Sequence, residues 1–260
     1  MAAPHVCILQ TSFAKREDTV AFLKEKVPGV RVEFITDSTL LTDVRANGGP
    51  SQAVIDRMTL YAKAAEISGA DLIVNSCSTV GEVADIYAKE VNVPVMKIDL
   101  PMAQEAVRLG TKIALIATLE TTLGPSQRLI EKVGAEQGKK MECTQYLQNP
   151  AWDALQAGHP EEHNRILMES IRELDKMGYD AIVMYSRGLY LDDSQVAEVE
   201  RVGAGGVPVF TNTLRNSAFS INYNITNEQQ HTLREYLKNG NKHNYRNALL
   251  YLRHIATPHR

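Results

Sequence analysis

The segment His5-Val-Cys-Ile-Leu-Gln-Thr11 recurs 107 positions later as Lys112-Ile-Ala-Leu-Ile-Ala-Thr118. Both copies are short apolar runs that end in a threonine, a pattern typical of strands buried on both faces of a parallel sheet. Two more pairs follow in the same order: Gly69-Ala-Asp-Leu-Ile-Val74 matches Gly178-Tyr-Asp-Ala-Ile-Val183, and Val93-Pro-Val95 matches Val207-Pro-Val209. Three ordered matches indicate that the chain contains two similar halves.

Strand-like and helical segments alternate along both halves. Apolar, β-branched runs predict strands at 6–10, 30–35, 71–75, 93–98, 112–117, 181–185 and 207–210. Helical periodicity predicts helices at 18–26, 51–68, 80–91, 125–133, 160–177 and 193–202. We expect Ser51 or its neighbour to cap one helix, and Pro125 and Pro160 to lie in the first turns of two others. Gly69 and Gly178 are expected to end helices in the left-handed conformation. This alternation predicts an α/β protein.

Each half is expected to form a small parallel sheet with helices on both faces. We place one lobe at residues 1–98 together with a basic helical tail at 216–260, and the other lobe at 99–215. Ligands of such sheets bind beyond the carboxyl ends of the strands, so two facing halves would share one cleft. Residues 37–50 and 147–159 are predicted to be long loops, which commonly serve as lids.

The composition narrows the class of protein. The chain has 260 residues, of which 44% are hydrophobic, enough to bury a core without disulfides or a metal. Three cysteines, an odd number, favour a reducing compartment, and we therefore expect a cytoplasmic protein. The formal charge of −3 gives no reason to expect nucleic acid as a partner. Neither a signal peptide nor a membrane span is visible, and we expect a homo-oligomer that binds no membrane.

Cys77 is the residue that best fits a catalytic role. It follows the predicted buried strand Asp71–Asn75 and directly precedes a predicted helix. Backbone N–H groups and the helix dipole stabilise a thiolate in that position, so the thiol could serve as a base or a nucleophile. Cys7 and Cys143 lie within strand-like runs instead and are expected to be inert core residues.

Ser186 occupies the corresponding place in the second half, six residues after Asp180 as Cys77 is six after Asp71. A serine hydroxyl is a poor base without an activating partner, and none adjoins Ser186 in the sequence. Hydroxyl, amide and guanidinium groups gather around the predicted strand ends and could hold a carboxylate or an enolate oxygen. These candidate substrate-binding residues are Thr11, Ser12, Asn75, Ser78, Thr79, Thr118 and Arg187.

Two motif-like patterns are interpreted as structural. His159-Pro-Glu-Glu-His163 matches the His-x-x-Glu-His pattern of one class of zinc protease. Pro160 would begin the helix and leave His159 outside it, so we expect a solvated helix start and no metal site. Gly203-Ala-Gly-Gly206 precedes a predicted strand rather than following one, and is expected to be a turn rather than a phosphate-binding loop.

The segment Asn75-Ser-Cys77-Ser-Thr79, its second-half counterpart, the Lys112–Thr118 run and the Val-Pro-Val segments together resemble the aspartate/glutamate racemase superfamily. That superfamily includes hydantoin racemases, maleate isomerases and arylmalonate decarboxylases, and the resemblance covers residues 5–220. It implies two pseudo-symmetric, Rossmann-like (flavodoxin-like) lobes with a cofactor-independent active site in the cleft between them. It also implies a cysteine at the end of the middle strand of each lobe. Cys77 fills the first place, whereas Ser186 departs from the pattern.

These observations predict an isomerase or racemase of a small carboxylate, such as an amino acid, a hydantoin or a dicarboxylate. Cys77 would be the acid/base or nucleophile, and Ser186 the second catalytic group. Two alternatives stay open: a decarboxylase or lyase that uses one proton-donating cysteine, and a non-catalytic protein that binds a small ligand. An unreactive Cys77 would favour the binding protein, since a binder needs no activated thiol.

Overall fold

The computed structural model describes residues 3–12, 16–186 and 206–211, without the side chains of Asp18 and Thr211. The described residues form two compact units that divide between Pro101 and Met102. Each unit holds one four-stranded parallel sheet, with the strand orders β2-β1-β3-β4 and β6-β5-β7-β8. The predicted α/β fold with two similar lobes is therefore confirmed.

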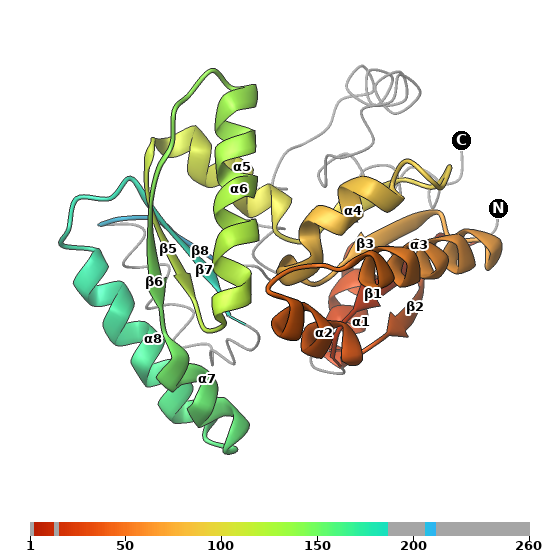
Figure 1. The fold of residues 1–260 in the computed structure, drawn as a ribbon, viewed down its shortest axis with the longest axis horizontal. Helices are drawn as coiled ribbons and strands as arrows, with labels where there is room; N and C mark the ends of the chain where they lie inside the picture. The colour runs from red at the N-terminus through yellow and green to blue at the C-terminus, as the bar shows by residue number, and fades with distance from the viewer. Residues whose placement is uncertain (1–2, 13–15, 187–205, 212–260) are drawn as a thin grey trace. The chain divides into compact units, whose positions relative to one another are not determined.

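The first unit contains five helices and four strands among the described residues (Figure 1). Its strands are β1 (His5–Gln10), β2 (Arg31–Thr36), β3 (Leu72–Asn75) and β4 (Val95–Lys97). Its helical segments are α1 (Arg16–Lys26), α2 (Thr39–Asn47), α3 (Gln52–Ile67), the 3-10 turn η1 (Ser78–Val80) and α4 (Gly81–Tyr87). Helix α5 (Leu100–Leu109) spans the boundary between the two units.

Alternation along the central strands builds a core on both faces of this sheet. Cys7, Leu9 and Ile73 face α2, α3 and α4. Val6, Ile8, Leu72 and Val74 face the other way and pack against Leu23 and Val27, at the end of α1. Because β1 and β3 are buried on both faces, their sequences are continuously apolar, which made them easy to predict.

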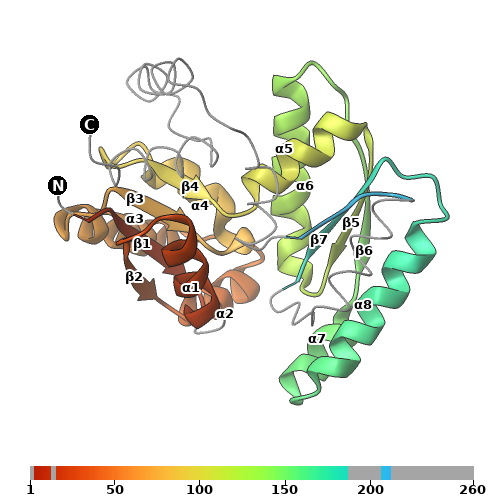
Figure 2. The same ribbon diagram turned by 180° about the vertical axis from the view of Figure 1, so that it is seen from behind.

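The second unit repeats this plan. Its strands are β5 (Lys112–Ala117), β6 (Glu142–Leu147), β7 (Ala181–Tyr185) and β8 (Val209–Thr211), and its helices are α6 (Glu120–Glu136), α7 (Asn149–Gln156) and α8 (Pro160–Leu174). Ala114, Ile116, Ile182 and Met184 pack against α7 and α8. Helix α6 covers the opposite face of the sheet, as the view from behind also shows (Figure 2).

The repeated aspartates have the same structural role in both units. Asp71 Oδ2 accepts a hydrogen bond of 2.8 Å from the backbone N–H of His5, at the start of β1. Asp180 Oδ2 accepts bonds of 2.8 and 2.9 Å from the N–H groups of Thr111 and Lys112, at the start of β5. The sequence repeat therefore extends to individual hydrogen bonds at the amino ends of the central strands.

Three predictions of local structure are wrong. Residues 37–50 and 147–159 are not long loops, because they contain α2 and α7. Helix α6 begins at Glu120, so Pro125 lies inside the helix rather than in its first turn. Helix α5 and strand β6 were not predicted. The predicted helix at 193–202, the turn at 203–206 up to Gly205 and the C-terminal tail lie outside the described residues.

The predictions for Ser51, Pro160 and Gly69 are confirmed, whereas Gly178 is left-handed but lies beyond the end of α8, which ends at Leu174. Ser51 Oγ accepts a hydrogen bond from the backbone N–H of Val54 at the start of α3. Pro160 begins α8, and Gly69 and Gly178 adopt φ angles of +83° and +76°. Because α8 begins at Pro160, His159 precedes the helix, and the two histidines of the His-x-x-Glu-His pattern do not lie on one helical face.

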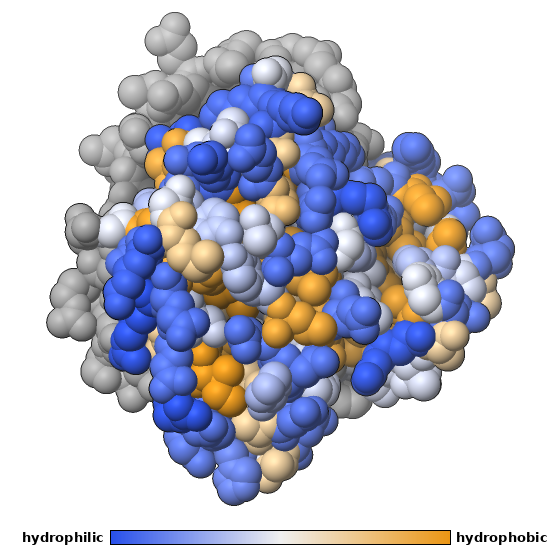
Figure 3. Space-filling model, turned by 60° about the vertical axis from the view of Figure 1, so that its left-hand side comes forward, coloured by the Kyte–Doolittle hydropathy of each residue, from blue (hydrophilic) through white to orange (hydrophobic). Residues whose placement is uncertain are grey.

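Hydrophilic side chains cover most of the face shown in Figure 3, where apolar side chains gather in smaller patches. Leu60 and Ile67 on α3 and Met177 after α8 are more than half exposed. Within the described part of the chain, no helix has the length and apolar character needed to span a bilayer. The same residues contain no group of three or more potential metal ligands.

Candidate functional site

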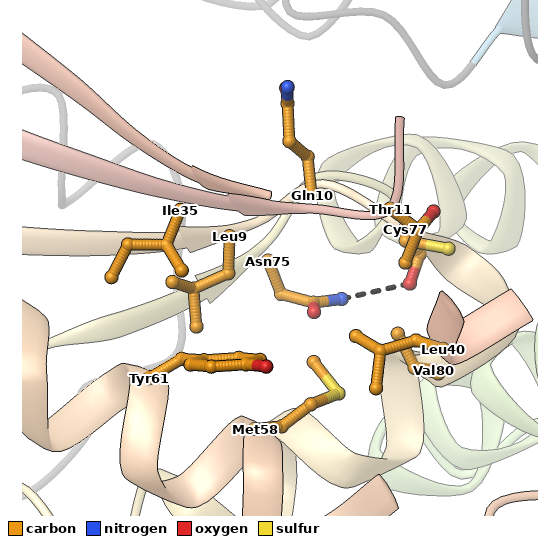
Figure 4. A pocket seen from close by; sticks show the side chains of 10 residues that line it. All are labelled: Leu9, Gln10, Thr11, Ile35, Leu40, Met58, Tyr61, Asn75, Cys77 and Val80. Atoms are coloured by element: carbon orange, nitrogen blue, oxygen red, sulfur yellow. Dashed lines mark hydrogen bonds between the residues drawn. The ribbon is translucent and has the colours of Figure 1, made fainter. Parts of the chain in front are cut away.

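A small pocket that is open to solvent lies at the carboxyl ends of β1 and β3 in the first unit. It is lined by Leu9, Gln10, Thr11, Ile35, Leu40, Met58, Tyr61, Asn75, Cys77 and Val80 (Figure 4). Three of the predicted site residues, Thr11, Asn75 and Cys77, therefore meet in one place. They lie at the carboxyl ends of β1 and β3, the edge of a parallel sheet where ligands commonly bind.

Backbone geometry places Cys77 at the pocket. Cys77 is extended, with φ −144° and ψ 112°, and immediately precedes η1. Asn75 Nδ2 donates a hydrogen bond of 3.0 Å to the Cys77 carbonyl oxygen, which fixes the turn from strand to helix (Figure 4). The Cys77 side chain is half-buried, so its sulfur lines the pocket without being sealed in the core.

Asn75 also presents a polar atom to the pocket. Its side chain is 1% exposed, and no described residue donates a hydrogen bond to its Oδ1. A buried amide oxygen without a donor is costly, so a ligand that carries an N–H group would be favoured there. Gln10, in contrast, points away from the other lining side chains and donates to Thr36 Oγ1.

The opposite wall of the pocket is apolar apart from one hydroxyl. Tyr61 and Met58 approach from α3 (Figure 4). The Tyr61 hydroxyl donates a hydrogen bond of 2.8 Å to Asp37 Oδ2, which lies 3.1 Å from Arg57 Nη1. Burial and this hydrogen bond raise the pKa of Tyr61, so the phenol stays protonated. Tyr61 is therefore a wall of the pocket and is not suited to be a base.

The other two cysteines are poor candidates for chemistry. Burial, with a smaller contribution from Glu33, raises the pKa of Cys7 to about 11. Burial, with a smaller contribution from Glu131, raises the pKa of Cys143 to about 11. Both thiols therefore stay protonated near neutral pH. Cys7 is a core residue as expected, whereas Cys143 is only half-buried on the edge strand β6, so the expectation of a core position is wrong for it.

A buried carboxyl lies next to η1. Asp99 follows β4 and is 2% exposed. Burial raises its pKa, although the Ser78 hydroxyl and the Lys97 ammonium oppose the shift. Lys97 is itself nearly buried, and its Nζ donates to Asp85 Oδ2 at 3.1 Å. Ser78 and Thr79 are buried in η1 and do not line the pocket, and only Ser78 is shown to interact with Asp99.

The second unit brings Thr118 and Ser186 to adjacent strand ends. Ser186 follows β7 directly and is 5% exposed, and Thr118 follows β5 and is 2% exposed. The backbone N–H of Thr118 donates to the Tyr185 carbonyl oxygen at 3.4 Å. The strand register supports the correspondence of Ser186 with Cys77. Two residues before Cys77, Asn75 pairs with Leu9 of β1. Two residues before Ser186, Met184 pairs with Ile116, the equivalent residue of β5. Arg187 lies outside the described residues.

Ser186 has a buried hydrogen-bond partner that the sequence did not reveal. His163 Nε2 lies 2.8 Å from Ser186 Oγ, and His163 Nδ1 lies 3.0 Å from Asn164 Oδ1. His163 is fully buried, so the interpretation of its motif as a solvated helix start is wrong for this residue. The sequence did contain a signal for this burial, because His163 lies on the same helical stripe as Leu167, Ile171 and Leu174. A histidine on such an apolar, buried stripe needs a hydrogen-bond partner.

Comparison with solved structures supports the fold. A putative Asp/Glu racemase from Yersinia pestis matches with a TM-score of 0.58 at 17% identity, covering 85% of this chain and 98% of that one. Glutamate racemase from Aquifex pyrophilus matches with a TM-score of 0.54 at 17% identity, covering 90% and 95%. Allantoin racemase from Klebsiella pneumoniae matches with a TM-score of 0.52 at 16% identity, covering 84% and 86%. At these low sequence identities, the structural matches show that this chain shares its fold with the three proteins.

The sequence itself identifies the family. No curated protein matches the chain at a significant level. The family model described as Asp/Glu/hydantoin racemase matches residues 17–211, which is three quarters of the chain and includes parts of both units. The chain therefore belongs to the Asp/Glu/hydantoin racemase family.

Proposed function

We propose that this protein is a cofactor-independent racemase or isomerase of a small carboxylate, with Cys77 as an acid/base. The observation that carries this proposal is the pocket at the ends of β1 and β3, where Cys77 and Thr11 line the same cavity as Asn75. The names of the similar structures, which are Asp/Glu, glutamate and allantoin racemases, support a substrate with an acidic hydrogen next to a carbonyl group.

In the proposed reaction, the Cys77 thiolate removes the α-proton of the substrate. The C–H bond breaks and an S–H bond forms, while the electron pair moves into the neighbouring carboxylate or hydantoin carbonyl. Hydrogen-bond donors must stabilise the developing oxyanion, and Thr11, Ser12 and Thr118 are assigned this role, with Arg187 as a further anion-binding group. Return of a proton on the opposite face by Ser186 inverts the carbon centre.

The binding side of the proposal rests on polarity. Asn75 Oδ1 is buried without a donor from the described residues and would accept a hydrogen bond from a substrate amine or ring N–H. Ser78 and Thr79 would hold the substrate through the backbone of η1 rather than through their buried side chains. The apolar wall formed by Met58 and Tyr61 favours a small substrate with little charge on that side.

A decarboxylase or lyase is a second candidate, because the second unit carries a hydroxyl where the first carries a thiol. A reaction that needs one proton on one face requires a single donor, and Cys77 could supply it. This reaction would release carbon dioxide or an unsaturated product, which a racemase does not.

Incubation in deuterated water with single enantiomers of aspartate, glutamate and a 5-substituted hydantoin would test the proposal. Loss of the α-proton signal by NMR, together with the appearance of the opposite enantiomer by chiral chromatography, is the expected result. Cys77→Ala should lower exchange of the enantiomer whose α-proton this thiol removes by about 10²–10⁴-fold. Cys143→Ala removes a thiol from β6 and should leave exchange unchanged.

Three results would change the conclusion. A product that has lost a carboxylate group as carbon dioxide would show that the protein is a decarboxylase rather than a racemase. Binding without exchange for any compound would favour a ligand-binding protein. Equal exchange by the Cys77→Ala and wild-type proteins would remove Cys77 from the mechanism.

A further inference from the structure

The buried stripe of α8 repeats that of α3. Residues Val54, Met58, Ala62 and Ala65 of α3 correspond to His163, Leu167, Ile171 and Leu174 of α8, each 109 positions later. The same interval relates Asp71 to Asp180 and Cys77 to Ser186. Both helices also pack on equivalent sheet faces, α3 against Leu9 and α8 against Ile116. The two helices are therefore counterparts, and His163 stands where the first unit has Val54.

This substitution pairs with the change at the strand end. The unit with a thiol at position 77 has an apolar valine on the matching helix, and the unit with a hydroxyl at position 186 has an imidazole there. Val54 and His163 are both fully buried. A buried imidazole costs free energy unless its nitrogens are hydrogen-bonded, so a core position of this kind favours histidine only where partners are fixed. Ser186 and Asn164 are those partners.

The hydrogen bonds define the tautomer of His163. An amide oxygen only accepts, so the 3.0 Å contact with Asn164 Oδ1 requires a proton on Nδ1. In the neutral ring Nε2 then carries a lone pair, and Ser186 Oγ donates its proton to Nε2 at 2.8 Å. The hydroxyl proton therefore already points at a base, as activation of a serine requires.

We propose that His163 is the proton acceptor behind Ser186 and makes this hydroxyl the second acid/base of the reaction. This role rests on the proposed function. When Ser186 Oγ takes the α-proton of a substrate, its own proton passes to His163 Nε2. One C–H and one O–H bond break, one O–H and one N–H bond form, and the electron pair stays on the substrate carbanion.

The resulting imidazolium keeps both of its hydrogen bonds. Nε2–H donates to Ser186 Oγ, and Nδ1–H continues to donate to Asn164 Oδ1, so no group must move during the transfer. In the reverse direction the imidazolium returns its proton to Ser186, which protonates the carbanion. His163 acts through Ser186 and is a positioning and proton-storing residue, while Asn164 holds its tautomer.

Enantiomer-selective exchange in deuterated water tests the relay. Each face of the substrate is served by one group, so His163→Gln should lower α-proton exchange of one enantiomer by about 10²–10⁴-fold and leave the other within about threefold. Ser186→Ala should affect the same enantiomer, and Cys77→Ala the opposite one. His5→Gln, which changes another buried histidine at the amino end of β1, is the matched control and should leave both rates unchanged.

A thiol at position 186 separates a proton relay from a structural role. Sulfur is a competent acid/base without a partner, so His163→Gln should cost less than about tenfold in the Ser186→Cys background. Destabilisation by the glutamine would instead lower the rate equally in both backgrounds, and thermal unfolding would reveal it. Equal losses, or full exchange of both enantiomers by His163→Gln, would overturn the relay while leaving the proposed function intact.

One measurement needs no mutant. The ring ¹⁵N chemical shifts of His163 in the wild-type protein should report a proton on Nδ1 and a lone pair on Nε2. The opposite tautomer would overturn the relay by itself. Absence of α-proton exchange in the wild-type protein for every compound of the panel would overturn the proposed function, and the relay with it.

Discussion

Limited alkylation with iodoacetamide should label Cys77 first among the three thiols. Only the thiolate reacts, so the rate at each site follows the fraction of thiolate and the access of the reagent. Cys77 lines a pocket and is half-buried. Cys7 and Cys143 have pKa values raised to about 11 by burial. The structure therefore predicts a large difference in rate between these sites.

The size of the difference follows from the thiolate fractions at pH 7.5. A thiol with a pKa of about 11 is ionised to about 3 × 10⁻⁴, and an ordinary thiol with a pKa of about 8.5 is ionised to about 0.1. Cys7 and Cys143 should therefore react about 300-fold more slowly than a free cysteine, before shielding by the core is counted. Raising the pH to 9.5 should speed their labelling about 100-fold, because the thiolate fraction rises tenfold per pH unit below the pKa.

Mass spectrometry of proteolytic peptides over a time course gives the rate at each site. The same chain unfolded in guanidinium chloride is the internal standard, since all three thiols should react there at similar rates. The ratio of native to unfolded rates then cancels differences in peptide detection. Labelling of Cys7 or Cys143 in the native protein as fast as Cys77 would refute the reasoning from burial, and inhibition that does not track Cys77 labelling would separate this thiol from activity.

Three further changes test the packing. Burial raises the pKa of Asp99, so its contribution to stability is greatest at low pH and is lost as the pH rises through the folded-state pKa. Relative to the wild type, Asp99→Asn should therefore increase the free energy of unfolding progressively above about pH 4. Urea titration at several pH values measures this, and an effect that does not depend on pH would contradict it. Gly110→Ala places a Cβ against the Asp180 carboxylate that holds the start of β5, and it should lower the free energy of unfolding by about 1–3 kcal/mol. Gly49→Ala is the control, because its Cβ would meet open space, and it should not lower the free energy of unfolding in this way. Ser51→Ala removes the cap of α3 and should cost about 1 kcal/mol, and an unchanged denaturation midpoint would show that the 3.4 Å bond contributes nothing.

The central strands could be predicted because burial on both faces makes their sequences continuously apolar. Strand β6, Glu142–Leu147, is an edge strand whose side chains are mostly exposed or half-buried, and its polar composition hides it. Helix α2 was missed for a related reason, since it buries only Leu40 and Val44 and ends in the glycine-rich segment that suggested a loop. Short elements that bury one or two residues carry too little periodicity to be detected.

The candidate residues of the two units differ in how far the sequence could predict their contacts. Thr11, Asn75 and Cys77 were predictable because parallel strands bring their carboxyl ends to one edge, whatever the loops do. The contact between His163 and Ser186 joins residues 23 positions apart on different elements, and only the packing of α8 on β7 creates it. The internal repeat could have drawn attention to His163, because an alignment of α3 with α8 matches this histidine with Val54.

The repeat also explains why the two strand ends could diverge while the rest of the plan was kept. Asp71 and Asp180 hold the amino ends of β1 and β5, so replacing either would leave backbone N–H groups at the start of the central strand without this acceptor. At the carboxyl ends the side chains differ, because Ser186 Oγ bonds to His163 Nε2 whereas the matching helix position in the first unit is Val54. A change from thiol to hydroxyl does cost proton-transfer ability, because a hydroxyl needs a base and a thiol does not. The imidazole at the position that corresponds to Val54 supplies that base from α8, which packs on β7, so the two differences between the units are best understood as one chemical unit.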